Sequence, residues 1–155
     1  LMFDMNLLWE QFIYVTLRKK KEAGTTITAQ TSKYFWKPDN GRRSSMKPDI
    51  WIQNGNENII LDTKWKNLNG FNPSPDDLRQ MYVYNDYWNS DKAMLLYPSN
   101  ESSFNGFAPF EKTSSQPSQH KCGLGTISIF KTDEPILNEK IGDLIIHWFT
   151  SVAVE

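Results

Sequence analysis

Short apolar runs and longer segments of helical periodicity alternate along this chain. Two strand-like runs cover residues 47–52 and 58–66, and the Asn54-Gly55 turn between them is typical of a β-hairpin because these residues tolerate positive φ. β-Branched and apolar content predicts further strands at residues 25–36, 93–97 and 126–130.

Helical periodicity marks three segments. The first helix is expected over about residues 4–20, where Leu8, Phe12 and Val15 recur on one face. A second helix is expected to begin at Ser74 or Asp76 and to run to about Trp88. A third follows Pro135 and carries an apolar stripe made of Ile141, Leu144, Ile145, Trp148 and Phe149.

The order of these elements is α-β-β-β-α-β-β-α, and the Ser-, Pro- and Gln-bearing residues 99–123 are expected to be mostly irregular. This order predicts an α/β fold with a mixed central sheet flanked by helices. A length of 155 residues with 39% apolar and 14% aromatic content suits one domain over residues 1–155 and excludes a disordered tail.

Cysteine and histidine are scarce. One cysteine and two histidines form neither a disulfide framework nor a standard structural zinc site, so a reduced, cytoplasmic setting is expected. No apolar stretch approaches the roughly 18 residues of a membrane span, and the first residues lack the pattern of a signal peptide, so no membrane association is expected.

The central hairpin carries the candidate chemistry. Strand alternation places Asp62 and Lys64 on one side of the second strand, and Asp49 stands at the start of the first. Two carboxylates suit Mg²⁺, which acidifies a water nucleophile, and a lysine stabilises charge developing on phosphorus. On its own, the Asp62/Lys64 pair is better explained as a surface ion pair. The Pro48-Asp49 dipeptide on the other strand of the hairpin instead favours a metal-dependent nuclease.

A second Pro-Asp dipeptide, Pro38-Asp39, competes with Asp49 for this role. Asn40-Gly41 follows it directly, and Pro-Asp-Asn-Gly is turn chemistry. Asp39 is therefore interpreted as a loop residue.

Pro48-Asp49 and Asp62-Thr63-Lys64 together resemble the PD-(D/E)xK pattern of restriction-endonuclease-like nucleases. Four segments in order are similar to the nuclease domain of McrC, the cleavage subunit of McrBC modification-dependent restriction systems: MKPDIWI at 46–52, ILDTKWK at 60–66, DLRQMYVY at 77–84 and LLYP at 95–98. The resemblance runs from the first helix to about Pro98. It implies a restriction-endonuclease-like core.

The resemblance also implies an activity. Mg²⁺, or Mn²⁺ in its place, is expected on Asp49, Asp62 and the backbone carbonyl of Thr63, with Lys64 beside the attacking water. The expected partners are DNA and an McrB-like AAA+ GTPase engaged through a region that normally precedes such a domain. No Gly-x-x-x-x-Gly-Lys-Ser/Thr occurs here, so GTP hydrolysis is assigned to that partner. Whether two copies pair as a homodimer to cut both strands is left open.

Two helical positions extend the candidate site. Glu10 lies among apolar residues of the first helix, and spacing alone leaves open whether it faces a metal or the solvent edge; the resemblance favours the metal shell. Gln80 and Tyr84 share a face of the second helix, and the similar Gln-xxx-Tyr pair of RecB-like nucleases borders the active site and touches DNA. The alternative for this pair is ordinary helix polarity beside a partly buried tyrosine.

Net charge is −1, which argues against strong autonomous DNA binding. Arg42 and Arg43 precede Asp49 and are candidate phosphate contacts, whereas the basic run of residues 18–21 suits a solvated helix C-terminus. The leading hypothesis is a Mg²⁺-dependent DNA endonuclease of the McrC type. The alternatives are a non-catalytic DNA- or partner-binding module of the same fold, and a related RecB-like repair nuclease.

Overall fold

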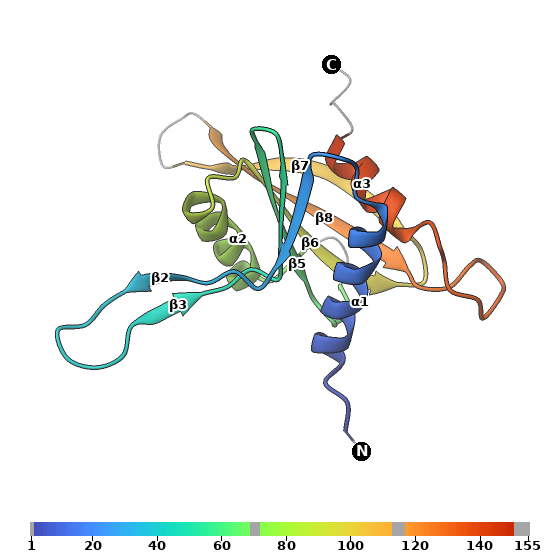
Figure 1. Ribbon diagram of the computed structural model, residues 1–155, viewed down its shortest axis with the longest axis horizontal. Coiled ribbons are helices and arrows are strands. Elements are labelled where there is room, and N and C mark those ends of the chain that lie inside the picture. The colour runs from blue at the N-terminus through green and yellow to red at the C-terminus, as the bar shows by residue number, and fades with distance from the viewer. Residues whose placement is uncertain (1, 69–71, 113–116, 151–155) are drawn as a thin grey trace.

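A mixed six-stranded sheet with helices on both faces forms the body of the protein, as the computed structural model describes it for residues 2–68, 72–112 and 117–150 (Figure 1). The helices are α1 (Met5–Lys20), α2 (Pro75–Tyr87) and α3 (Ile141–Thr150). The strands are β1 (Thr25–Ala29), β2 (Lys33–Trp36), β3 (Ser44–Met46), β4 (Ile50–Asn54), β5 (Glu57–Thr63), β6 (Lys92–Ser99), β7 (Ser103–Glu111) and β8 (Pro117–Ser128).

The main sheet has the strand order β1-β4-β5-β6-β8-β7. β1, β4 and β5 are antiparallel, and the β4–β5 hairpin turns at Gly55, whose φ of 59° lies in the left-handed region. β5, β6 and β8 are parallel, with α2 as the connection from β5 to β6. The C-terminal ends of β5 and β6 therefore lie side by side, and Asp62 is level with Leu95.

Both faces of the sheet are buried, which explains the nearly continuous apolar run of β5. Ile59 and Leu61 pack into the core under α1 and α3, whereas Ile60 packs with Met81 and Trp88 on the α2 side. Because side chains alternate along a strand, Asp62 shares the α2 side with Ile60. Asp62 thus places a carboxylate at the C-terminal end of β5, a central strand whose two faces are both covered.

The expected fold class is confirmed, and several elements match closely. The paired central strands lie at β4 and β5, and Ser74 caps α2 by accepting a hydrogen bond from the Asp77 N–H at 3.1 Å. Asp39 lies in the connection between β2 and β3, as expected for a loop residue. Among the described residues, no helix is long and apolar enough to cross a membrane.

The single strand expected over residues 25–36 is wrong. β1 ends at Ala29, and Gln30 takes a φ of 54°, so the chain turns out of the main sheet. β2 then pairs with β3 in a separate antiparallel ribbon that projects from the body (Figure 1). Residues 33–47, which include this ribbon, are called the arm below.

The irregular loop expected over residues 99–123 is also wrong, because β7 and most of β8 occupy it. Serine, proline and glutamine hide the alternation there, and the prolines are tolerated because β7 is an edge strand and Pro117 begins β8. Gly123 and Gly125 leave room for aromatic rings, since a Cβ would lie 2.7 Å from Phe104 and 2.9 Å from Trp148 respectively. Residues 113–116 lie outside the described part of the chain.

The apolar stripe of the first helix is displaced from the one expected. Leu8 is 55% exposed and Val15 is 45% exposed, whereas Trp9, Ile13 and Leu17 are buried against the sheet. The first turn of α1 reaches past the sheet (Figure 1), so apolar residues there find no neighbour to cover them. The helix remains as expected in length, with Asp4 as its N-cap.

Candidate active site

The ends of β4 and β5 bring two of the expected carboxylates together. Asp49 directly precedes β4, and its carboxylate Oδ2 accepts hydrogen bonds from the Thr63 N–H at 2.7 Å and the Thr63 Oγ1 at 2.8 Å. Thr63 follows Asp62 in β5, so these bonds hold Asp49 against the strand that carries the second carboxylate. The hairpin predicted from sequence thus builds the acidic pair.

Lys64 lies on the same side as Asp62, as strand alternation predicted. Its Nζ is 2.6 Å from the Asp62 Oδ2, and the two side chains are 19% and 4% exposed. Burial acts to lower the pKa of Lys64, but the charge of Asp62 and its hydrogen bond outweigh burial and raise that pKa. Lys64 is therefore a positively charged, largely shielded ammonium at the edge of the site.

Asp62 bears the strongest electrostatic conflict in the site. Burial, followed by repulsion from Asp49, raises the pKa of Asp62 to about 7, although Lys64 acts in the opposite direction. Asp62 consequently exchanges its proton near neutral pH instead of staying ionised as an exposed aspartate does. A positive charge added between the two carboxylates would relieve this conflict.

Glu10 joins the carboxylate pair from α1. It is 9% exposed, so the solvent-edge alternative is wrong, and its Oε1 accepts a hydrogen bond from the Gln30 Nε2. Burial raises the pKa of Glu10, and the nearby Asp49 raises it further, while the Gln30 bond opposes them. Lys47 supports this contact, because its Nζ donates to the Gln30 Oε1 at 3.4 Å.

Gln80 and Tyr84 face the site from α2, as expected. Gln80 accepts a hydrogen bond from the Lys64 Nζ at 3.0 Å and donates through Nε2 to the Tyr84 hydroxyl at 2.9 Å. Tyr84 donates in turn to the backbone carbonyl of Lys47 at 3.0 Å. This chain of bonds connects Lys64 to the segment that leads into Asp49, so α2 helps to position both ends of the constellation. A role of the pair in touching DNA stays a prediction.

Asp77 belongs to the site although sequence reasoning did not single it out. Its Oδ1 is 3.4 Å from the Lys64 Nζ, and its Oδ2 is 2.6 Å from the Lys66 Nζ. Burial acts to raise its pKa, but the hydrogen bond from Lys66 and the charge of Lys64 prevail and lower that pKa. The available signal in the sequence was weak: an acidic residue in the first turn of α2, and two lysines, Lys64 and Lys66, directly after β5.

The donor set suits a hard cation. In residues 2–68, 72–112 and 117–150, no three His, Cys, Asp or Glu side chains are grouped so as to hold a metal ion by themselves. Mg²⁺ does not need such a cage, because it commonly takes one or two carboxylates and completes its shell with water and phosphate oxygens. Asp49 and Asp62, with their mutual repulsion, fit that mode of binding.

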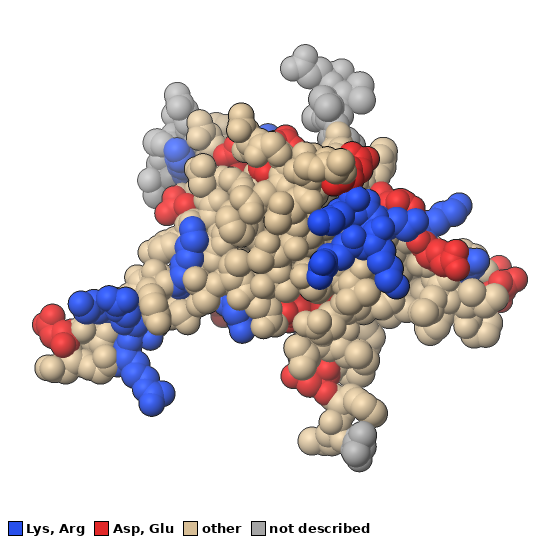
Figure 2. All heavy atoms as spheres, viewed as in Figure 1, with Lys and Arg blue, Asp and Glu red and all other residues tan. Residues whose placement is uncertain are grey.

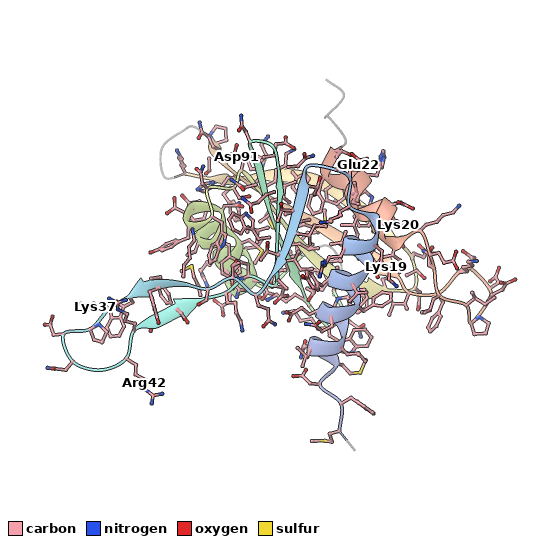
Figure 3. All side chains as sticks on the ribbon, in the orientation of Figure 1. Lys19, Lys20, Glu22, Lys37, Arg42 and Asp91 are labelled. Atoms are coloured by element: carbon pink, nitrogen blue, oxygen red, sulfur yellow. The ribbon has the colours of Figure 1, made fainter. Side chains whose placement is uncertain are left out.

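Arg42 and Arg43 are not brought to the carboxylates. They lie in the β2–β3 connection, and Figure 3 shows Arg42 at the far end of the arm. Lysine and arginine gather there and again near the C-terminal end of α1, where Lys19 and Lys20 lie (Figures 2 and 3). The sequence prediction of phosphate contact by these arginines therefore concerns a surface beside the site.

Comparison with known proteins identifies the family and supports the fold. A family model described as McrBC 5-methylcytosine restriction system component matches residues 1–98. No curated protein matches the chain. A chain in the solved half-complex from the tetradecameric assembly of Thermococcus gammatolerans McrB AAA+ hexamers with bound McrC is similar, with a TM-score of 0.64 and 21% identity. The match covers 92% of this chain and 33% of that one, and it supports the fold.

Proposed function

Because the chain belongs to the family of McrBC 5-methylcytosine restriction system components, we propose that it is the DNA-cleaving domain of an McrC-like subunit and that it hydrolyses phosphodiester bonds with Mg²⁺. The observation that supports this most directly is the Asp49–Asp62–Lys64 constellation. Two carboxylates meet at the edge of the sheet, and a charged lysine lies 2.6 Å from one of them. Carboxylates that can hold a divalent cation, with a positive charge beside them, suit metal-assisted phosphodiester hydrolysis.

Asp49 and Asp62 hold the metal in this proposal, with the Thr63 backbone carbonyl as a further ligand and Glu10 at the outer edge of the metal shell. When bound, Mg²⁺ neutralises phosphate charge and makes a water molecule more acidic. Mn²⁺ is expected to substitute, because it accepts the same oxygen ligands.

Lys64 performs the remaining electrostatic task. Its ammonium orients the attacking water and stabilises the negative charge that develops on phosphorus. Gln80 and Asp77 hold that ammonium from α2, at 3.0 and 3.4 Å respectively, which restricts its position before substrate arrives. Both are positioning residues that act through Lys64.

The partners are part of the proposal. The solved neighbour is described as an assembly of McrB AAA+ hexamers with bound McrC, and this chain spans about a third of the length of the chain that it matches there. We infer an McrB-like AAA+ GTPase as partner, with DNA as substrate. Two copies of this domain would be needed to cut both strands at once.

A plasmid-nicking assay tests the activity. The purified chain with Mg²⁺ or Mn²⁺ is expected to convert supercoiled plasmid to nicked circles, and Asp62→Ala or Lys64→Ala should abolish the conversion. Asp91→Ala serves as the matched control, because Asp91 is exposed and Figure 3 shows it at the top of the view, away from the arm. Equal nicking by the wild type and both site variants would reveal a contaminating nuclease and refute the proposal.

Calorimetric titration with Mn²⁺ separates cleavage from mere binding. The wild type is expected to bind Mn²⁺, and Asp49→Ala should remove the heat of binding, whereas Asp91→Ala should keep it. A wild-type chain that neither nicks plasmid nor binds Mn²⁺ would favour the non-catalytic binding module instead.

A further inference from the structure

The arm exposes a run of three aromatic side chains. Tyr34, Phe35 and Trp36 are consecutive in β2 and are 63%, 49% and 56% exposed. The pairing of β2 with β3 shifts register between Tyr34 and Trp36, and all three rings remain exposed there, so the body of the domain covers none of them. Large exposed apolar groups clustered in this way mark an interaction surface.

The arm also concentrates positive charge. Residues 33–47 contain five lysines and arginines and one aspartate, a net charge of +4, in a chain whose net charge is −1. In the described part of the chain, Lys37, Arg42 and Arg43 form no ion pair with a carboxylate, and the Arg43 guanidinium lies 4.9 Å from the centre of the Tyr34 ring. Figure 2 shows basic groups gathered on the outer part of the arm, where Figure 3 labels Lys37 and Arg42.

The base of the arm is fastened to the candidate active site. On one side, the Gln30 N–H donates to the backbone carbonyl of Asp49 at 3.0 Å. On the other side, the backbone carbonyl of Lys47 accepts the Tyr84 hydroxyl at 3.0 Å, and Lys33 donates to the carbonyl of Tyr87 at 2.7 Å. The base of the arm is therefore fixed beside Asp49, and the rest of the arm extends away from it.

We propose that the arm binds duplex DNA next to the phosphodiester that is cut. Lys37, Arg42 and Arg43 contact phosphates on this surface, and Phe35 and Trp36 pack on sugars and on the apolar base edges that the groove exposes. A two-stranded ribbon fits the major groove, which is about 12 Å wide, and arginine and lysine supply most of the affinity for the backbone. The inference rests on the proposed function, because a duplex whose phosphodiester reaches Asp49 must run past the base of the arm.

Fluorescence anisotropy tests this with a labelled 30-base-pair duplex in EDTA, so that no cleavage occurs. Arg42→Ala/Arg43→Ala is compared with Lys19→Ala/Lys21→Ala, which removes the same charge from the exposed C-terminal end of α1. The arm variant is expected to bind about tenfold more weakly and to lower the slope of log K against log salt by about 2, since each phosphate contact contributes about 0.9. The control should change binding less than twofold.

Trp36 tests the aromatic contribution separately. Trp36→Ala is expected to weaken duplex binding severalfold, because it removes apolar contact with sugars and with thymine methyl groups in the groove, and Trp36→Phe should restore most of it. Circular dichroism spectra that match the wild type establish that each variant is folded. A Trp36→Ala variant that binds like the wild type would overturn the aromatic contact.

The outcomes separate this inference from the proposed function. One outcome would overturn the arm proposal alone: the wild type nicks plasmid and Asp62→Ala does not, but the arm variant and the α1 variant bind duplex DNA with the same affinity. The arm then does not bind DNA, and the nuclease proposal stands. Absence of saturable duplex binding by the wild type overturns the inference as well. If light scattering shows that Trp36→Ala converts a dimer to a monomer without changing DNA affinity, the arm joins two copies of this chain instead.

Discussion

Replacing Asp62 by asparagine should make the metal-free protein more stable at pH 8. Asparagine keeps the shape of the aspartate side chain but carries no charge. Asp62 is 4% exposed, and its ionised form suffers both burial and repulsion from Asp49. The variant removes that conflict, while Lys64 keeps its contacts to Gln80 and Asp77.

The magnitude follows from the pKa of Asp62, which moves from 3.8 to about 7 on folding. Between these values the folded state binds more protons than the unfolded state, so the free energy of unfolding of the wild type falls as pH rises. About three pH units correspond to an upper limit of about 4 kcal/mol, since one unit is worth about 1.4 kcal/mol. Asp62→Asn lacks this loss. Its advantage over the wild type should be smallest near pH 4 and greatest above pH 7.

Urea unfolding in EDTA at pH 4, 6 and 8 measures this difference directly. We expect the gap between Asp62→Asn and the wild type to widen by about 2 to 4 kcal/mol from pH 4 to pH 8, or roughly 4 to 16 °C in melting temperature for a chain of this size. Asp91→Asn, an exposed aspartate, is the control and should show no such widening. A gap that stays constant with pH, or an Asp62→Asn variant less stable than the wild type at pH 8, would refute the electrostatic conflict at Asp62.

Two further substitutions test the packing around the site. Gln80→Ala removes one of the contacts that hold Lys64, so plasmid nicking should fall on the order of tenfold to a hundredfold. The melting temperature should stay within a few degrees of the wild type. Unchanged nicking would show that the position of Lys64 does not depend on Gln80. Leu61→Ala should cost about 2 to 5 kcal/mol in urea unfolding, because Leu61 is fully buried between α1, α3 and the sheet. A loss below about 1 kcal/mol would contradict the packing of β5.

The central hairpin, β4 and β5, was predictable from the sequence because its determinants are local. Gly55 sets the turn, the turn sets the register, and the register decides which of the nearby residues share a face. Asp62 and Lys64 are two residues apart, and side chains alternate along a strand, so both must lie on the same face once a strand is assigned there. The α2 contacts of Gln80 and Tyr84 needed only helical spacing and the resemblance of the motif.

The arm and the β7–β8 pair were not predictable in the same way. Tyr34, Phe35 and Trp36 have strong strand propensity, so they read as a continuation of β1, and only the turn at Gln30 shows that they leave the sheet. That turn is stabilised by contacts far along the chain, to Asp49 and Glu10. β7 likewise exists because its partner β8 pairs with the buried β6, an arrangement that no local pattern reveals.

Asp77 marks the limit of motif reading. A search for metal ligands favours carboxylates on strands, whereas the contribution of Asp77 is a charge on α2 that balances Lys64 and Lys66. An acidic residue at this position also suits the N-terminal end of a helix, so its sequence context has an ordinary explanation. Only the distances from the Asp77 carboxylate to the ammonium groups of Lys64 and Lys66 show that Asp77 does more than complement the helix dipole.

The carboxylates of the site explain why a cation should bind here. Asp49 and Asp62 repel one another in a buried place, and Glu10 adds a third carboxyl whose pKa is raised by that same burial and by Asp49. Lys64 offsets part of this, but it also pairs with Asp77, so its charge is divided between two carboxylates. A divalent cation would replace the protons near neutral pH and remove the repulsion that destabilises the metal-free fold. The features that lower stability in the absence of metal are therefore the ones expected to favour metal binding in the proposed function.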